Sequence, residues 1–326
     1  MNGLGLGAAL AILSILVAST SEPGRAQYPT RPITLVVASA PGGPADIYAR
    51  LVSDKMSSAL GQRIVIENVS GSGGIIGAAR VARADPDGYT LLIHQTGISI
   101  ARALTPNLPY DVAKDFAVVG LINETHALLI GRKDLPASTF PDLIEWMKGP
   151  GKPAKVAHPG KGSLGHLVAE MIGKHVGAEI NAVPYRGIAP AINDLLGGHV
   201  DLLWGSAGIF APLANEGKVK AYVYSGSVRS HLAPNIPASS ELSVPAIMSV
   251  PIWHALFVPA GTPKPVVESL NAALRKGLAD PVIAKTFHDD GSNAFPEDMQ
   301  SPEAGDTHVR RELARWHDVV RTLQLK

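Results

Sequence analysis

The sequence contains no cysteine. Its absence excludes disulfide bonds, thiolate metal ligands, cysteine nucleophiles and a lipid-modified N-terminal cysteine. Charged residues make up only 17% of the chain, aromatic residues only 5%, and the formal net charge is +1. This balance supplies neither the basic surface nor the aromatic platforms that bind nucleic acid, so we expect no nucleic-acid partner. A hydrophobic content of 46% over 326 residues is nevertheless enough for the cores of two ordinary domains.

The N-terminal stretch differs in composition from the rest. Residues 4–18 form an apolar run that is shorter than the roughly 20 residues of a membrane-spanning helix and typical of a secretory signal peptide. Gly24 and Ala26 have the spacing of a cleavage site, so we expect residues 1–26 to be a signal peptide that is removed on export to the periplasm. Residues 1–3 carry no Lys or Arg, which leaves an uncleaved N-terminal anchor as the alternative. No later run is long enough to span a membrane, and we expect the remainder to be soluble.

A strand, a glycine turn and a helix follow one another early in the chain. Residues 33–38 form a short apolar run rich in β-branched side chains, which is typical of a strand. The turn Pro41-Gly42-Gly43-Pro44 comes next, and apolar residues then recur at helical spacing as far as Gly61. The N–H groups of a first helical turn have no partner within the helix, and the helix dipole is positive there. This unit therefore predicts half of a cleft that binds a carboxylate.

The same pattern recurs along the chain. In the first half, residues 63–67 lead into a loop with Gly73 and Gly74, and residues 89–94 lead into Gln95 and Thr96. In the second half, residues 155–157, 181–184 and 200–204 lead into the turns Gly160-Lys161-Gly162-Ser163, Tyr185-Arg186-Gly187 and Gly205-Ser206-Ala207-Gly208. Open α/β sheets bind ligands beyond the carboxyl ends of their strands. Two groups of such units predict an α/β protein whose loops face a crevice.

Longer motifs join these units in order along the chain. They are Ala40-Pro-Gly-Gly-Pro-Ala-Asp46, Gly71-Ser-Gly-Gly-Ile-Ile-Gly77, Pro86-Asp-Gly-Tyr-Thr90, Gly160-Lys-Gly-Ser-Leu-Gly-His166, Val183-Pro-Tyr-Arg-Gly187 and Val258-Pro-Ala-Gly-Thr-Pro263. As an ordered series, these motifs resemble those of the Bug family, the periplasmic receptors of tripartite tricarboxylate transporters. The resemblance covers essentially all of the predicted mature chain.

The resemblance implies a fold and a function. The expected fold is α/β, a two-lobed type II periplasmic-binding-protein fold in which two crossings join the lobes and the ligand cleft lies between them. By that analogy, lobe one comprises residues 28–125 plus 252–326, and lobe two comprises residues 126–251. The implied ligand is a small organic mono-, di- or tricarboxylate, and the implied partners are the subunits of a membrane permease. We expect a monomer without a cofactor.

The same reading predicts the binding residues. One carboxylate would lie in lobe one against the N–H groups of Gly42 and Gly43 and the Gln95–Thr96 loop, and the distal end of the ligand would meet lobe two. The predicted ligand-binding residues are Pro41, Gly42, Gly43, Asp46, Gly73, Gly74, Gln95, Thr96, Gly162, Ser163, His166, Gly187, Ile188 and Ala189. Two positions depart from the usual family residues, Ala45 in place of Thr and Ser72 in place of Ala. The identity of the ligand therefore does not carry over.

Several of these side chains have a purely structural alternative. Asp46 could orient bridging waters or a ligand amino group, or it could simply be stabilised by the helix N-terminus, and we expect it to shape the loop. Ser163 fits the N-cap of a helix as well as a ligand contact. His166 could donate to a carboxylate or be a satisfied histidine at the lobe interface. Gly73 and Gly74 could serve tight helix–strand packing, and Arg50 is expected to pair with a surface carboxylate.

Other chemistry has little support in the sequence. Residues 160–165 fit the dinucleotide pattern G-x-G-x-x-G, but the strand before them is short and the unit does not open a domain. The chain has no G-x-S-x-G nucleophile elbow, no P-loop and no H-E-x-x-H motif. We therefore predict no catalytic residue and no metal site. Two alternatives to a transport receptor remain open, a receptor that presents its ligand to a sensor kinase and an enzyme on a two-lobed α/β scaffold.

Overall fold

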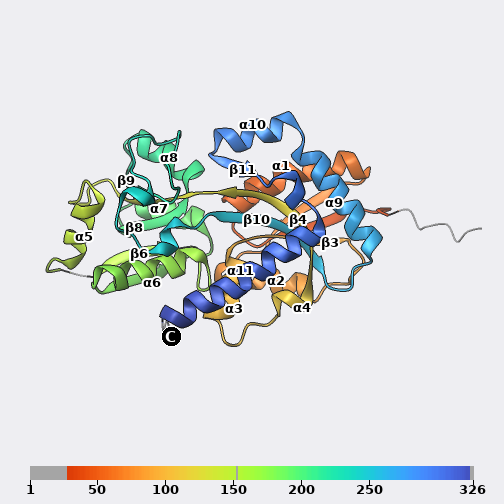
Figure 1. The fold of residues 1–326 in the computed structure, drawn as a ribbon, viewed down its shortest axis with the longest axis horizontal. Coiled ribbons are helices and arrows are strands. Elements are labelled where there is room, and N and C mark those ends of the chain that lie inside the picture. The colour runs from red at the N-terminus through yellow and green to blue at the C-terminus, as the bar shows by residue number, and fades with distance from the viewer. Residues whose placement is uncertain (1–27, 152, 324–326) are drawn as a thin grey trace, which may run out of the picture.

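The strands gather in two separate sheets in the computed structural model, which describes residues 28–151 and 153–323 (Figure 1). The six-stranded sheet has the order β11 (Ser292–Ala294), β4 (Phe116–Thr125), β10 (Ile252–Pro259), β3 (Thr90–Gln95), β1 (Ile33–Val37) and β2 (Ile64–Asn68). The five-stranded sheet has the order β7 (Ile180–Pro184), β6 (Ala154–His158), β8 (Leu202–Ser206), β5 (Ala127–Arg132) and β9 (Val219–Tyr224). Strands β1, β2 and β3 are mutually parallel, as are β6, β7 and β8. The carboxyl ends of each trio therefore share one edge of their sheet.

The chain passes between the two sheets twice. It leaves the first sheet where β4 ends and β5 begins, with His126 between them, and it returns through Val250 and Pro251 into β10. We propose on this basis to divide the molecule as the sequence suggests, and we use the name lobe one for residues 28–125 plus 252–323 and lobe two for residues 126–251. Both connections are short, so the two lobes face each other across a narrow gap.

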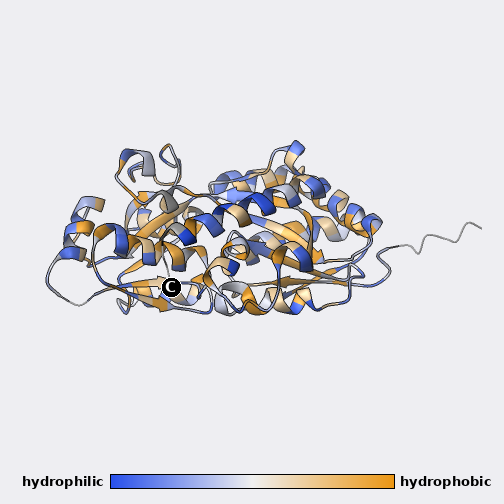
Figure 2. Cartoon of the chain, turned by 60° about the horizontal axis from the view of Figure 1, so that its bottom comes forward, coloured by the Kyte–Doolittle hydropathy of each residue, from blue (hydrophilic) through white to orange (hydrophobic). Residues whose placement is uncertain are grey.

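Alternating side chains place helices on both faces of the first sheet. On one face, Ile33, Leu35 and Val37 of β1 pack against α1 (Pro44–Leu60), α9 (Lys264–Leu278) and α10 (Pro281–Asp289). On the other face, Val36 packs against α2 (Ile75–Ala82), α3 (Gly97–Leu104) and the start of α11 (Pro302–Leu323). This alternation is the period of a strand that is buried on both sides. Figure 2 shows the hydrophobic colouring following the strands, while the outer helices carry more hydrophilic residues.

Lobe two is layered in the same way. One face of its sheet packs against α5 (Phe140–Lys148) and α6 (Leu164–Val176), and the other against α7 (Ile188–Leu196) and α8 (Ala207–Asn215). The return connection from residue 228 to residue 250 is largely irregular and holds the 3-10 turns η2 (Ser239–Glu241) and η3 (Ala246–Ser249). Each lobe thus has its own sheet and its own helix layers.

The C-terminal helix α11 packs against both lobes. Val309 lies in the core of lobe one, whereas Trp316 and Val320 pack in a cluster that includes α6 and β5 of lobe two. Between them, the buried carboxylate of Glu312 accepts hydrogen bonds from the indole N–H of Trp316 at 3.1 Å and of Trp253 at 3.4 Å. Both indole rings are buried in the core.

The sequence did not predict every element. Helix α3 was not predicted, since Gly97 and Ser99 favour turns. Its burial stabilises it as a helix, with Ile98 and Ala101 in a core cluster of lobe one and Ile100 in a cluster with lobe two. The short helix α4 (Val112–Asp115) and strand β11 were also missed.

The predicted signal peptide lies outside the described residues. Among the described helices, none combines the length and the apolar composition needed to cross a membrane.

Candidate ligand-binding site

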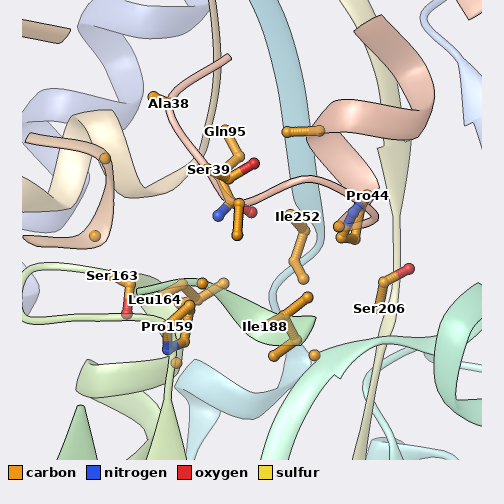
Figure 3. A pocket seen from close by; sticks show the side chains of 18 of the residues that line it. Ala38, Ser39, Pro44, Gln95, Pro159, Ser163, Leu164, Ile188, Ser206 and Ile252 are labelled. Carbon is orange, nitrogen blue, oxygen red and sulfur yellow. The ribbon is translucent and has the colours of Figure 1, made fainter. Parts of the chain in front are cut away.

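A cavity of about 60 Å³ lies between the lobes, and both lobes line it (Figure 3). Figure 3 shows Ser39, Gln95 and Pro44 on one side, and Ser163, Leu164 and Ile188 on the other. The full lining comprises Ala38, Ser39, Ala40, Gly43, Pro44, Ala45, Gly71, Gly73, Gly74, Gln95, Pro159, Ser163, Leu164, Gly165, Arg186, Gly187, Ile188, Trp204, Gly205, Ser206 and Ile252. A concave site shared by two lobes, apolar for the most part with a few polar groups, is the usual form of a small-molecule site.

Five helices begin at this cavity. The N-cap residues Gly43 of α1 and Gly74 of α2 line it from lobe one, and Ser163 of α6, Gly187 of α7 and Ser206 of α8 line it from lobe two. Each helix N-terminus carries roughly half a positive elementary charge and N–H groups without an intrahelical partner. The arrangement therefore offers backbone donors and a positive potential from two opposite sides, which suits an anion.

The first glycine turn is held in place by Asp46. One carboxylate oxygen of this buried residue accepts the N–H of Gly42 at 3.0 Å, and the other accepts the amide of Asn68 at 2.9 Å. Arg50 completes the shell with contacts of 3.0 and 3.1 Å. Burial alone would raise the pKa of Asp46, but the hydrogen bonds from Arg50, Gly42 and Asn68 outweigh it and lower the pKa below its usual value. The residue is ionised and its lone pairs are occupied.

Two predictions about this turn need correction. Arg50 was expected to pair with a surface carboxylate, but it pairs with Asp46, whose side chain is only 4% exposed. The N–H of Gly42 was expected to face the ligand, yet it donates to Asp46 and Gly42 does not line the cavity. The cause is the positive φ of 78° at Gly42, which turns this N–H back toward the helix. The N–H of Ala45, in the first turn of α1, has no acceptor in the described chain.

The second glycine loop fits closely against its surroundings. Gly73 and Gly74 have φ values of 63° and 98°, which L-residues with side chains rarely adopt. A Cβ on Gly74 would lie 2.3 Å from Nε2 of His94, and a Cβ on Gly73 would lie 2.7 Å from the carbonyl oxygen of Lys161 in lobe two. Burial lowers the pKa of His94 to about 4, so this ring is neutral at physiological pH. Both glycines are required by packing and also line the cavity.

The lobe-two wall is built on the N-terminus of α6. The hydroxyl of Ser163 donates to the carbonyl of Gly160 at 2.7 Å and accepts the N–H of His166 at 3.2 Å, so it is an N-cap at the cavity wall. His166 itself does not line the cavity. Its ring packs on that of His158 at 4.6 Å between centroids, and its Nε2 lies 3.9 Å from Oε1 of Glu170. These contacts favour the structural alternative for His166.

The predicted binding residues divide into two groups. Half of them line the cavity, namely Gly43, Gly73, Gly74, Gln95, Ser163, Gly187 and Ile188. The others are close in sequence to lining residues but do not line the cavity themselves, namely Pro41, Gly42, Asp46, Thr96, Gly162, His166 and Ala189. Thr96 joins two strands, since its N–H donates to the carbonyl of Trp253 at 3.0 Å and its hydroxyl accepts the N–H of Trp253 at 2.9 Å. Ala189 belongs to the first turn of α7, just beyond the lining residue Ile188.

Three polar lining residues were missed in the sequence. The hydroxyls of Ser39 and Ser206 have no hydrogen-bond partner within residues 28–151 and 153–323, and both residues line the cavity. Arg186 lines it as well and is the one charged residue of the lining. Ser39 and Arg186 each lie two residues after the end of a strand, and Ser206 is the last residue of β8. This position near a strand end is the one signal in the sequence that could have indicated them.

The dinucleotide and metal alternatives gain no support from the geometry. Gly160 packs against Gly73 of lobe one and Gly165 against Pro159, so this turn serves contacts within the protein. Within the described part of the chain, no group of three or more His, Asp or Glu side chains is arranged to hold a metal ion.

Two α/β lobes that share a ligand-sized cavity define a two-lobed periplasmic binding protein. Solved structures agree with this class. BugD, described as a periplasmic binding protein, has a TM-score of 0.87 and 35% identity over 92% of this chain and 99% of its own. MatC from Rhodopseudomonas palustris, solved with bound malate, has a TM-score of 0.85 and 36% identity over 90% of this chain and 100% of its own. The expected two-lobed fold is therefore confirmed.

The sequence comparisons identify the family. Residues 48–325 match the sequence model of the tripartite tricarboxylate transporter family receptor. A UPF0065 protein from the TAR-I ttuE-ttuC' intergenic region of Agrobacterium vitis is 37% identical over 94% of this chain and 90% of its own. Protein BugT of Bordetella pertussis is 31% identical over 96% of each chain. The chain belongs to the tripartite tricarboxylate transporter receptor family, as its resemblance to Bug proteins implied.

Proposed function

We propose that the protein is a solute receptor that captures a small organic carboxylate between its lobes and delivers it to a tripartite permease. The observation that carries this proposal is the convergence of five helix N-termini on one cavity. A carboxylate loses its hydration shell when the lobes close over it, and that loss is costly unless every oxygen finds a donor. Backbone N–H groups at helix ends supply such donors without a full counter-charge.

The groups at the cavity that have no hydrogen-bond partner within the protein suggest which donors hold the ligand. In lobe one, the free groups are the N–H of Ala45, the hydroxyl of Ser39 and the side chain of Gln95. In lobe two, they are the N–H groups of Leu164 and Gly165 in α6, those of the first turn of α7 and the hydroxyl of Ser206. We propose that one carboxylate group of the ligand lies against the lobe-one donors while its distal end meets lobe two. Bound ligand would thus bridge the lobes and stabilise their contact.

Two solved relatives support the ligand class. MatC was solved with malate, and a further R. palustris protein was solved with adipate, at 33% identity and a TM-score of 0.83. Both ligands are small organic acids. The cavity of about 60 Å³ favours a compact acid for this chain as well.

Calorimetry with a panel of organic acids on the protein beginning at Gln27 tests the proposal. A Cβ on Gly43 would lie 3.5 Å from both the carbonyl of Ala40 and Cγ2 of Ile188, so the branches of Gly43→Val would enter the space between the lobes. We expect at least one acid to bind, and Gly43→Val to weaken it by about tenfold or more. The proposal fails if no organic acid binds, or if Gly43→Val leaves the affinity of every bound acid unchanged.

Export and delivery have their own tests. We propose periplasmic export with removal of residues 1–26, and mass spectrometry of the exported protein should give a chain that begins at Gln27. Delivery to a permease predicts that deleting the receptor gene abolishes uptake of the bound acid. Uptake that continues unchanged, together with loss of a transcriptional response to the acid, would favour a receptor for a sensor kinase instead. Light scattering should give the mass of one chain.

A further inference from the structure

Arg186 is a cation without a partner at the wall of the cavity. It directly precedes Gly187, the N-cap of α7, and it lines the cavity. Within the described residues, its guanidinium forms no ion pair and no hydrogen bond. Other exposed arginines are paired, as Arg80 is with Glu67 and Arg229 with Glu241. The unpaired guanidinium therefore adds to the positive end of the helix beside it.

The cavity holds no negative side chain to balance this charge. None of the lining residues is Asp or Glu. The carboxylate closest in sequence to the first glycine turn, Asp46, already accepts hydrogen bonds from Gly42, Arg50 and Asn68. An ammonium group on a ligand would consequently find no free acceptor of opposite charge there. The field inside the cavity favours ligands with more than one negative charge and no positive charge.

The chemistry of the guanidinium matches a second carboxylate. Its planar N–H groups donate two parallel hydrogen bonds to the two oxygens of such a group. A ligand whose first carboxylate lies against the donors of lobe one would present its distal group to lobe two, the lobe that carries Arg186. An ion pair that is partly shielded by the closed lobes is screened less by salt than one on an open surface.

We propose that Arg186 is a specificity-determining residue that binds the second anionic group of the ligand. The site then selects dianionic acids over monoanionic acids of the same length and rejects the corresponding amino acids. This inference rests on the proposed function and deepens it, because carboxylate binding by backbone donors does not by itself require a second charge.

Calorimetry with matched ligands tests the inference. Succinate, butyrate and aspartate share one carbon skeleton, and adipate, hexanoate and α-aminoadipate share a longer one. In the unaltered protein, we expect the dicarboxylate of at least one series to bind about tenfold or more tighter than both analogues. Arg186→Met should weaken that dicarboxylate by about tenfold and the monocarboxylate by clearly less, so that the preference between them shrinks. Arg186→Lys should retain part of the preference, because a lysine keeps the charge without the planar donor pair.

A matched control and a salt series separate this role from a structural one. Arg83 is another exposed arginine whose side chain has no partner among residues 28–151 and 153–323, so Arg83→Met should change neither affinity nor preference. Raising the salt concentration should weaken the dicarboxylate less in Arg186→Met than in the unaltered protein. Thermal melting checks that both variants remain folded.

The possible outcomes are distinct. If Arg186→Met keeps the full preference for the dicarboxylate, or if the amino acid binds as tightly as its parent diacid, the inference is overturned while the proposed function stands. If neither series nor any other organic acid binds, the proposed function itself fails, and the inference fails with it.

Discussion

Gly160 of lobe two and Gly73 of lobe one meet backbone to backbone across the gap between the lobes. A Cβ on Gly160 would lie 2.3 Å from the nitrogen of Gly73 and 3.1 Å from its Cα. A similar contact lies nearby, where a Cβ on Gly187 would lie 2.9 Å from the Cβ of Ala40. Glycine at these positions therefore lets the two lobes approach closely enough to enclose the cavity.

The first prediction concerns this contact. In Gly160→Ala, the new methyl group cannot avoid the backbone of Gly73, so the closed arrangement of the lobes is disfavoured. We expect ligand affinity to fall by about tenfold or more, and X-ray scattering with saturating ligand to give a larger radius of gyration than the unaltered protein. Gly198→Ala is the matched control, since Gly198 also has a positive φ of 74° but nothing lies within 4 Å of its Cβ position. Equal losses of affinity in both variants would contradict the prediction.

The second prediction concerns Asp46. In Asp46→Ala, the N–H of Gly42 and the amide of Asn68 lose their charged, buried acceptor, which costs about 1–3 kcal/mol of unfolding free energy. The first glycine turn should also relax, so affinity should fall together with stability. Urea unfolding and calorimetry measure the two effects. Arg50→Met serves as the comparison, because the side chain of Arg50 is 57% exposed and its loss should cost less. A larger effect of Arg50→Met would show that the ion pair, rather than the loop contact, matters.

The third prediction is a loss of stability in mild acid. Burial lowers the pKa of His94 and His158 to about 4 and that of His254 to about 3, with the neighbouring His166 contributing at His158 and His94 contributing at His254. Unfolded histidine titrates near pH 6.5, so between about pH 6.5 and pH 4 the unfolded chain binds protons that the folded chain does not. The free energy of unfolding should therefore fall as the pH is lowered through this range, by up to about 1.4 kcal/mol per pH unit for each histidine.

Two carboxyl groups oppose this fall in stability at lower pH. The test therefore compares how steeply the stability of a variant and of the unaltered protein depends on pH. Burial raises the pKa of Asp290 and of Glu124, and these groups stabilise the fold slightly as they take up protons. Urea midpoints measured between about pH 7 and pH 5 should show a shallower dependence in His254→Gln than in the unaltered protein. An unchanged slope in this variant would contradict the assignment of His254 as a neutral buried group.

The fourth prediction concerns the carboxylate under the C-terminal helix. Glu312→Ala removes the acceptor of two buried indole N–H groups, those of Trp253 and Trp316. We expect a loss of about 1–3 kcal/mol of unfolding free energy, measured by urea unfolding, with altered tryptophan fluorescence in the folded state. Glu303, exposed in the first turn of the same helix, provides the control variant Glu303→Ala, which should lose less. Comparable losses would contradict a special role for the buried carboxylate.

Local patterns predicted most of the elements that carry the site. The helix from Pro44 to Leu60 was predicted between its starting proline and Gly61, which ends it with a φ of 68°. The residues that start and end a helix act on the backbone next to them, so they can be recognised from the sequence alone. Helix α3 was missed because its stability comes from burial against both lobes, which no short window of sequence records.

The site itself could be predicted only to the level of its loops. The sequence placed glycine turns after the strands, but it could not show that Asp46 binds the N–H of Gly42 and leaves that of Ala45 free. Ser39, Ser206 and Arg186 were overlooked because many polar residues follow strands, and only the packing of the two lobes determines which of them face the gap.

The groups that are free to hold an acid belong largely to the main chain, and that has a consequence for how such receptors diverge. A substitution cannot delete a peptide N–H, except by introducing proline. Substitutions at apolar lining positions such as Leu164, Ile188 and Trp204 therefore alter the size and shape of the cavity, while the backbone N–H groups that bind an anion remain. Duplicated copies of one gene could in this way acquire new nutrients through few changes, without ever passing through a form that binds nothing.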